Sequence, residues 1–287
     1  MLLDNVHVIN LERSKDRLYN ISKNLGKYNI KFKKFSAIEG KKLTEEQIYD
    51  NTTYACRLIL CNHGLVGCAL SHISLWKELI NDNTTNHYII LEDDSIIDSE
   101  FKNVITEIDN IKDKLNFDIL SLYCGQSINC HQYENIYKLS NGIIIGRPIY
   151  PLSMTCYIIN KQGAKKLLSL IDQINYHIDF EIAWKTLFND IKYYSLNRNI
   201  IKHNWETKST IESHGTQSIF MYIIDKIGLN QVYWILNIPA FTLFMKYTIN
   251  LYMVLLITLL IINIIWFKNI YLYIFIIIEI IFYFSKL

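Results

Sequence analysis

Three consecutive acids, Glu92, Asp93 and Asp94, directly follow a short apolar run at residues 87–91. The run is typical of a buried strand, and carboxylates at the end of a buried strand are costly unless something compensates them. On a strand, Glu92 and Asp94 point to one face and Asp93 to the other, with the first two about 7 Å apart. Such a pair can share a hydrated Mg²⁺ or Mn²⁺ ion, whose usual partner is a diphosphate. The alternative is a solvated junction between strand and loop.

Two arginines, Arg13 and Arg17, lie one helical turn apart soon after the expected first strand. Guanidinium groups bind phosphate well, so the pair can face an anionic ligand. The alternative is pairing with Glu12 and Asp16 on a solvated helix face.

Two further pairs are candidates for site residues. Ser71 and His72 lie on an expected helix at residues 65–79, where a histidine is either a ligand contact or structural. Asp179 and Glu181 can deprotonate an attacking hydroxyl, or they are acids that a helix N-terminus favours. 

Two histidines, His203 and His214, lie in the polar stretch before an apolar tail. Either can complete a metal coordination sphere, and either can be an exposed side chain.

The elements that must position these residues alternate between strand and helix patterns. A strand–helix–strand order at the start predicts a βαβ unit and an α/β fold, in which ligands bind beyond the carboxyl ends of the strands. We expect strands at 6–10, 30–35, 88–91, 117–123, 143–150, 154–160 and 192–195, and helices at 14–25, 65–79, 102–115, 162–171 and 180–188.

The composition gives no indication of a nucleic-acid partner and does not decide whether the cysteines form disulfides. The chain has 287 residues and a net charge of +2, without a basic stripe, so nothing indicates a nucleic-acid partner. The six cysteines form no Cys-x-x-Cys pair, so the sequence does not predict a zinc motif. We expect buried free thiols, although the even number permits disulfides.

The C-terminal tail is dominated by apolar residues. Residues 247–267 carry no charge and match the length of about 20 residues that a helix needs to cross a bilayer. A second run at 270–284 contains Glu279, so we expect either a transmembrane hairpin or one span plus an interfacial segment. The alternative is a buried helix pair in a soluble core. Residues 219–244 predict amphipathic helices on a membrane surface.

The expected organisation is therefore a catalytic domain at 1–216, an interfacial linker at 217–246 and a membrane segment at 247–287. Because no N-terminal signal is apparent, we expect the catalytic domain on the cytosolic side of the membrane.

Six segments resemble, in order, those of glycosyltransferase family 25, which includes bacterial lipo-oligosaccharide galactosyltransferases and collagen galactosyltransferases. They cover about residues 5–212. The segments are residues 8–13 with Arg17, 35–40, 67–72 with Trp76, 90–94, 157–167 and 178–179.

The resemblance implies a GT-A-like nucleotide-sugar-binding domain, with a Rossmann-like mixed sheet flanked by helices, here followed by the C-terminal transmembrane helices. It implies inverting transfer of galactose or glucose from a UDP-sugar to a glycan, lipid-linked or protein hydroxyl acceptor. Mn²⁺ or Mg²⁺ would bind Asp94, and we expect Glu92 and His203 as further ligands. The resemblance does not identify the base; we expect Asp179, with Glu181 second. The donor would contact Asn10, Leu11, Arg13, Arg17, Ala37, Glu39, Ser71, His72, Glu92 and Asp93.

Two other functions remain open. One is a catalytically silent scaffold with the same fold, which recruits a partner at a membrane. The other is a nucleotidyltransferase, but the sequence lacks a glycine-rich phosphate loop.

Overall fold

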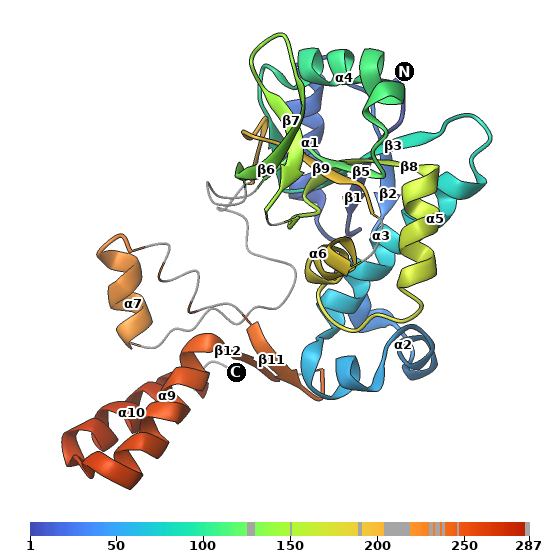
Figure 1. Cartoon of the computed structure of the whole chain (residues 1–287). Helices are drawn as coiled ribbons and strands as arrows, with labels where there is room; N and C mark the ends of the chain where they lie inside the picture. The colour runs from blue at the N-terminus through green and yellow to red at the C-terminus, as the bar shows by residue number, and fades with distance from the viewer. Residues whose placement is uncertain are drawn as a thin grey trace. The chain divides into compact units, whose positions relative to one another are not determined.

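The computed structural model (Figure 1) describes residues 1–124, 130–149, 151–188, 191–203, 219–229, 232, 236, 239–245 and 247–284. The chain forms two compact units. The first comprises Met1–Asn51 and Leu65–Lys208, and the second comprises Thr52–Gly64 and Ser209–Leu287. The association of residues 52–64 with the C-terminal part is not apparent from the sequence, because it depends on contacts between distant segments.

The first unit alternates strands and helices. Its strands are β1 (Val6–Asn10), β2 (Lys33–Ser36), β3 (His87–Glu92), β4 (Ser95–Ile97), β5 (Ile119–Ser121), β6 (Gln132–Lys138), β7 (Ile144–Pro148), β8 (Cys156–Asn160), β9 (Tyr193–Leu196) and β10 (Ile201–His203). Its helices are α1 (Lys15–Gly26), α2 (Glu45–Asn51), α3 (His63–Asn81), α4 (Phe101–Leu115), α5 (Lys161–Leu170) and α6 (Ile178–Phe188), with short 3-10 turns η1 (Leu2–Asp4) and η2 (Gly40–Lys42).

An eight-stranded mixed sheet, in the order β2-β1-β3-β8-β5-β9-β7-β6, forms the centre of this unit. β1 is parallel to both β2 and β3, while β8 runs antiparallel between β3 and β5. β4 and β10 form a separate antiparallel pair. The expected α/β class with a mixed sheet flanked by helices is confirmed.

Helices cover both faces of the sheet. Figure 1 shows α1 and α4 on one side and α3, α5 and α6 on the other. Alternation along β3 explains this, because Ile89 and Leu91 join the core formed with α1 and α4, whereas Tyr88 and Ile90 point the other way. The same alternation on β8 directs Tyr157 toward α3, where it meets His72 and Trp76.

The second unit contains most of the apolar tail. It consists of η3 (Cys56–Leu60), α7 (Ile219–Lys226), the antiparallel pair β11 (Pro239–Leu243) and β12 (Tyr247–Asn250), α9 (Leu251–Ile262), η5 (Asn263–Phe267) and α10 (Ile270–Phe284). α7 agrees with part of the expected helical linker. The expectation of helix at 239–243 is wrong, because this segment pairs with β12 as a strand.

The expected transmembrane helix is not found. Across the described ranges, no helix is long and apolar enough to cross a membrane. The uncharged run 247–267 begins as strand β12, and its helical part ends at Phe267, before Lys268, whose φ of 48° is left-handed. The uncharged length of the sequence is therefore longer than any one helix within it.

Four of the six cysteines are paired, which corrects the expectation of free thiols. Cys56 pairs with Cys61 and Cys124 with Cys130, whose Cα atoms lie 4.8 and 4.9 Å apart, within the usual range for disulfides. Cys68 and Cys156 are free.

Candidate active site

The candidate residues gather at one edge of the central sheet. β1, β2 and β3 are parallel, so their carboxyl ends meet there, and the register places Ile9 beside Glu92 and Asn10 beside Ser36. The chain after β2 continues this arrangement, since the Ala37 N–H donates to the Asn10 carbonyl at 2.9 Å. Leu11 and Ala37 are half-buried at this edge. Carboxyl ends of strands are where α/β folds bind ligands.

The acid triplet divides between two groups of partners. β3 ends at Glu92, and Asp93 and Asp94 form a turn. Glu92 faces His72 on α3, whereas Asp93 faces α1, as alternation along a strand predicts. Asp94 departs from the expected alternation because it lies in the turn, and its carboxylate approaches the Arg17 guanidinium at 3.4 Å.

Asp93 is held by two donors. Its carboxylate accepts hydrogen bonds from Asn10 Nδ2 at 2.7 Å and from Arg17 at 2.6 Å. Burial nevertheless raises the pKa of Asp93, against the lowering effects of Arg17 and Asn10. Arg17 is thus placed between two acids, Asp93 and Asp94, and supplies the positive charge that their burial requires.

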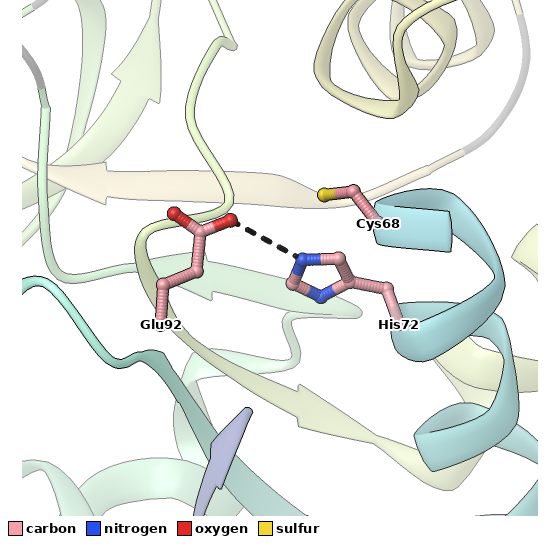
Figure 2. Close-up of side chains that lie close together, drawn as sticks. All are labelled: Cys68, His72 and Glu92. Atoms are coloured by element: carbon pink, nitrogen blue, oxygen red, sulfur yellow. Dashed lines mark ion pairs between the residues drawn. The ribbon is translucent and has the colours of Figure 1, made fainter. Parts of the chain in front are cut away.

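His72 and Glu92 meet across the gap between α3 and β3 (Figure 2). His72 Nε2 lies 3.5 Å from a Glu92 carboxylate oxygen. Desolvation lowers the pKa of His72 to about 4, so the imidazole is neutral at neutral pH and the contact is not a charged pair. Figure 2 also shows Cys68 beside them, one helical turn before His72. Burial, together with the charges of Glu92, Asp179 and Asp94, raises the pKa of the Cys68 thiol.

A buried hydrogen-bond network fixes the His72 ring. His72 Nδ1 lies 2.9 Å from the Tyr157 hydroxyl, which accepts a hydrogen bond from Trp76 Nε1 at 2.9 Å. Tyr157 lies on β8, so the ring is bound to the sheet as well as to its own helix. This orients Nε2 toward Glu92.

The loop after β2 lies directly against α3. A Cβ atom on Gly67 would come within 2.5 Å of the Ile38 carbonyl and 2.6 Å of the Gly40 nitrogen. The Ser71 hydroxyl accepts from the Ile38 N–H at 2.9 Å and donates to the Gly67 carbonyl at 2.7 Å. Ser71 is therefore buried in a structural contact that places the loop.

Arg13 and Glu39 form an ion pair with each other across this loop. Lys42 also contacts Glu39, at 2.8 Å. Arg13 is half-exposed, whereas Arg17 is largely buried. In the sequence, Arg13 and Arg17 are equivalent candidates for binding an anion, but their environments differ. Arg17 is held by Asp93 and Asp94 of the acid triplet, whereas Arg13 lies at the surface.

The two candidate bases, Asp179 and Glu181, also differ in exposure and in their hydrogen-bond partners. Glu181 is buried, and its two oxygens accept hydrogen bonds from the Asn175 backbone and side-chain amides. Asp179 is partly exposed, with His177 Nδ1 3.6 Å from its carboxylate. Its charge acts on the pKa values of both Cys68 and His72, which places it near the α3 side of the site.

Some expected residues are not tested, and others were missed. The side chain of His203 and all of His214 lie outside the described residues. Cys68, Trp76 and Tyr157 were not proposed as site residues. The spacing of Cys68 and His72, four apart on a helix, is a signal that could have paired them.

This geometry can bind an anionic group near Arg17 and a cation near the carboxylates, beside a partly exposed acid that could act as a base. Known proteins with related sequences fit that chemistry. Procollagen galactosyltransferase 2 of Mus musculus is 28% identical over 177 residues, which cover 58% of this chain and 28% of that protein. The Homo sapiens protein of the same name is 29% identical over 178 residues, with the same coverage. A Haemophilus influenzae protein is 31% identical over 171 residues, covering 58% of this chain and 57% of that one.

The similarity thus spans little more than a quarter of the mammalian relatives and more than half of the bacterial one. Residues 3–182 match the family described as glycosyltransferase family 25 (LPS biosynthesis protein). That match contains the carboxyl ends of β1, β2 and β3, all of α3 and the start of α6. The chain belongs to glycosyltransferase family 25.

Proposed function

We propose that this chain transfers a hexose, galactose or glucose, from a UDP-sugar to a hydroxyl group of a glycan, a lipid-linked glycan or a protein, with inversion at the anomeric carbon. The observation that carries the proposal is the acid triplet at the carboxyl ends of three parallel strands, with Arg17 between Asp93 and Asp94. The names of the mammalian relatives favour galactose.

The donor would lie along the edge formed by Asn10, Leu11 and Ala37. Arg17, with Arg13 at the surface, would face the diphosphate, since guanidinium groups match phosphate oxygens. Donor binding would then share the Arg17 charge between the diphosphate and the acids that hold it. Glu39 orients Arg13 through their ion pair.

The residues present fit a hard divalent cation. Asp94 and Glu92 offer carboxylate oxygens at the end of β3, which suit Mg²⁺ or Mn²⁺. When bound, the ion would supply positive charge to the UDP leaving group. Asp93 is engaged with Asn10 and Arg17 and would support the site from the scaffold side.

Asp179 is the proposed base. Its partly exposed carboxylate would remove the proton of the acceptor hydroxyl as that oxygen bonds to the anomeric carbon and the bond from that carbon to UDP breaks. Glu181 ranks second because its oxygens are already engaged with Asn175.

A donor screen tests the proposal. UDP-galactose, UDP-glucose and UDP-N-acetylglucosamine are offered with and without Mn²⁺, and UDP release is measured. We expect metal-dependent release from one hexose donor, and a loss of about 100-fold or more in Asp94→Asn, because this removes charge at the proposed metal ligand. Asp113→Asn, an exposed acid on α4, is the matched control and should keep full activity.

Two outcomes would contradict parts of the proposal. UDP binding without turnover of any donor would favour the silent scaffold. Full activity in folded Asp94→Asn would remove Asp94 from the metal site.

A further inference from the structure

Cys68, His72 and Glu92 form a cluster, and the proposed transfer uses only Glu92 of the three. Cys68 and His72 lie four residues apart on α3, so their side chains share one face of the helix, and Glu92 meets them from the end of β3 (Figure 2). One possible ligand atom from each residue lies within 4.8 Å of the other two. These three residues therefore offer a sulfur, a nitrogen and an oxygen to a common point.

This mixed set of donor atoms is unlike that of the carboxylates alone. Mg²⁺ and Mn²⁺ prefer oxygen ligands, whereas thiolate and imidazole favour zinc. We propose that Cys68, His72 and Glu92 form a binding site for a thiophilic divalent cation such as Zn²⁺, which shares Glu92 with the carboxylate site at Asp94 but takes its other ligands from α3. The site needs no nucleotide-sugar, so it does not depend on the proposed transfer.

The geometry is close to that of a zinc site. Zn–S bonds of about 2.3 Å and Zn–N bonds of about 2.0 Å place neighbouring ligand atoms roughly 3.5 Å apart in a tetrahedron. His72 Nε2 and the Glu92 carboxylate are already 3.5 Å apart. Side-chain rotations that move atoms by about 1 Å would bring the Cys68 sulfur to the same separation.

The surroundings support His72 as a ligand. Metal-binding histidines usually donate their other ring N–H to an acceptor, and Nδ1 of His72 lies 2.9 Å from the Tyr157 hydroxyl. Trp76 donates to the same hydroxyl and fixes its position. The histidine is thus oriented in advance, with Nε2 directed to the cluster.

The site is also accessible and surrounded by negative charge. Glu92 and Cys68 are both partly exposed, while His72 is buried. The charges of Asp94 and Asp179 act on Cys68. On binding, the Cys68 thiol would release its proton to solvent and bind as thiolate. Three protein ligands leave a fourth position for water or another ligand.

Cobalt substitution tests the site in the full chain. Metal-stripped protein, kept without reducing agents so that the disulfides persist, is titrated with Co²⁺. We expect a thiolate-to-cobalt charge-transfer band that saturates at one ion per chain and disappears when Zn²⁺ is added. Cys68→Ala should lose the band. Cys156→Ala, the matched control at the other free cysteine, should keep it.

Two further variants separate this site from its neighbours. Asp94→Asn should keep the band, even if the donor metal site is lost. Tyr157→Phe should keep the band but weaken Co²⁺ binding about 10- to 100-fold, because it removes the acceptor for His72. Circular dichroism checks that each variant is folded.

Alkylation provides a readout that needs no variant. Zn²⁺ should protect Cys68 from iodoacetamide, as measured by mass spectrometry of the wild-type chain. Equal alkylation with and without Zn²⁺ would overturn the proposal. So would a missing band in the wild type, or a band that persists in folded Cys68→Ala.

Discussion

Both units of the chain bury carboxylates, and the groups around Asp93 in the first unit differ in charge from those around Glu279 in the second. In the first unit, Asp93 lies against the Arg17 guanidinium and the Asn10 amide. In the second, Glu279 accepts hydrogen bonds from neutral groups, the Tyr252 hydroxyl at 2.7 Å and the Phe220 N–H at 3.0 Å. A guanidinium can be shared with an incoming anion, whereas neutral donors inside a helix cluster fix packing. The first environment suits a ligand site, and the second suits a structural one.

Apolar side chains show the same contrast. In the first unit many of the large ones lie between the sheet and its helices, as Phe101 and Trp76 do, although Trp184 and Phe188 on α6 are exposed. In the second unit many lie on the surface of α9, η5 and α10; Trp266 is 72% exposed and Tyr271 79% exposed. Tryptophan is thus buried at Trp76 and exposed at Trp266, so residue type alone does not determine burial.

The largest effect is expected from Arg17→Ala. Removing the guanidinium leaves Asp93 and Asp94 without their charged partner, at a cost of about 3–5 kcal/mol. Because burial already raises the pKa of Asp93, its neutral form is stable at low pH, and the loss of stability should grow as pH rises above 4. Urea unfolding at pH 4 and pH 8 measures this difference.

The control is Arg13→Ala, which removes a half-exposed pair with Glu39 and should cost less than about 1 kcal/mol. Equal losses of stability in Arg17→Ala and Arg13→Ala would show that the buried ion pairs of Arg17 contribute no more than the half-exposed pair of Arg13.

A second effect concerns His7, a buried histidine on β1 of the central sheet. His7 stacks on Tyr88 with ring centroids 4.0 Å apart, and desolvation lowers its pKa to about 4. The unfolded chain, with an ordinary histidine pKa of about 6.5, therefore binds the proton first as pH falls. Between pH 6.5 and 4 this histidine should remove about 3 kcal/mol of stability. 

The variant His7→Phe keeps the ring stack and should remove the His7 contribution to that pH dependence, leaving that of His72, as measured by thermal unfolding at several pH values. An unchanged pH profile would show that His7 is not the group responsible.

A third effect tests the close contact between α3 and the loop after β2. In Gly67→Ala, the new Cβ would meet backbone atoms of Ile38 and Gly40, which must shift, at a cost of about 1–3 kcal/mol. The same shift moves the loop that lines the proposed donor site, so UDP binding by calorimetry should weaken. Gly26→Ala, where a Cβ meets nothing within 4 Å, is the control and should be neutral.

The smallest effect is expected from Glu279→Gln in the second unit. A glutamine side chain keeps one carbonyl oxygen, so one of the two donors, Tyr252 or Phe220, loses its acceptor, at a cost of about 1–2 kcal/mol. Hydrogen exchange should accelerate in α10 and remain unchanged in α3. A faster exchange in α3 would show that the buried acid of the second unit also supports the first.

Most regular elements of the first unit could be predicted from local patterns. The first strand, the helix ending at Gly26 and the strand before the acid triplet all occur where periodicity indicates them. β6 was not anticipated, because its residues are largely exposed and polar and show little alternation. The tail was predicted least well: an uncharged run indicates apolar surroundings, but it does not specify where a helix begins and ends.

Only part of the candidate active site was predicted, because local sequence identifies candidate residues but not the contacts between distant segments. Asp93, Asp94 and Arg17 were proposed from type and position, and the structure brings them together. Nothing local indicated that Glu92 would turn to His72, or that Tyr157 would reach His72 across 85 residues of sequence. Such contacts depend on strand order, and β8 lies beside β3 only after the whole sheet has formed.

The sequence by itself determined the α/β class, the family and the acids at the end of β3, because each depends on residue order within short segments. Only the tertiary structure decided which charges are paired, which cysteines are joined and which acids share a face with α3. These properties depend on distances between segments that are far apart in the chain. The difference between Arg17 and Arg13, or between Asp179 and Glu181, therefore appears only when the sheet and its helices are assembled.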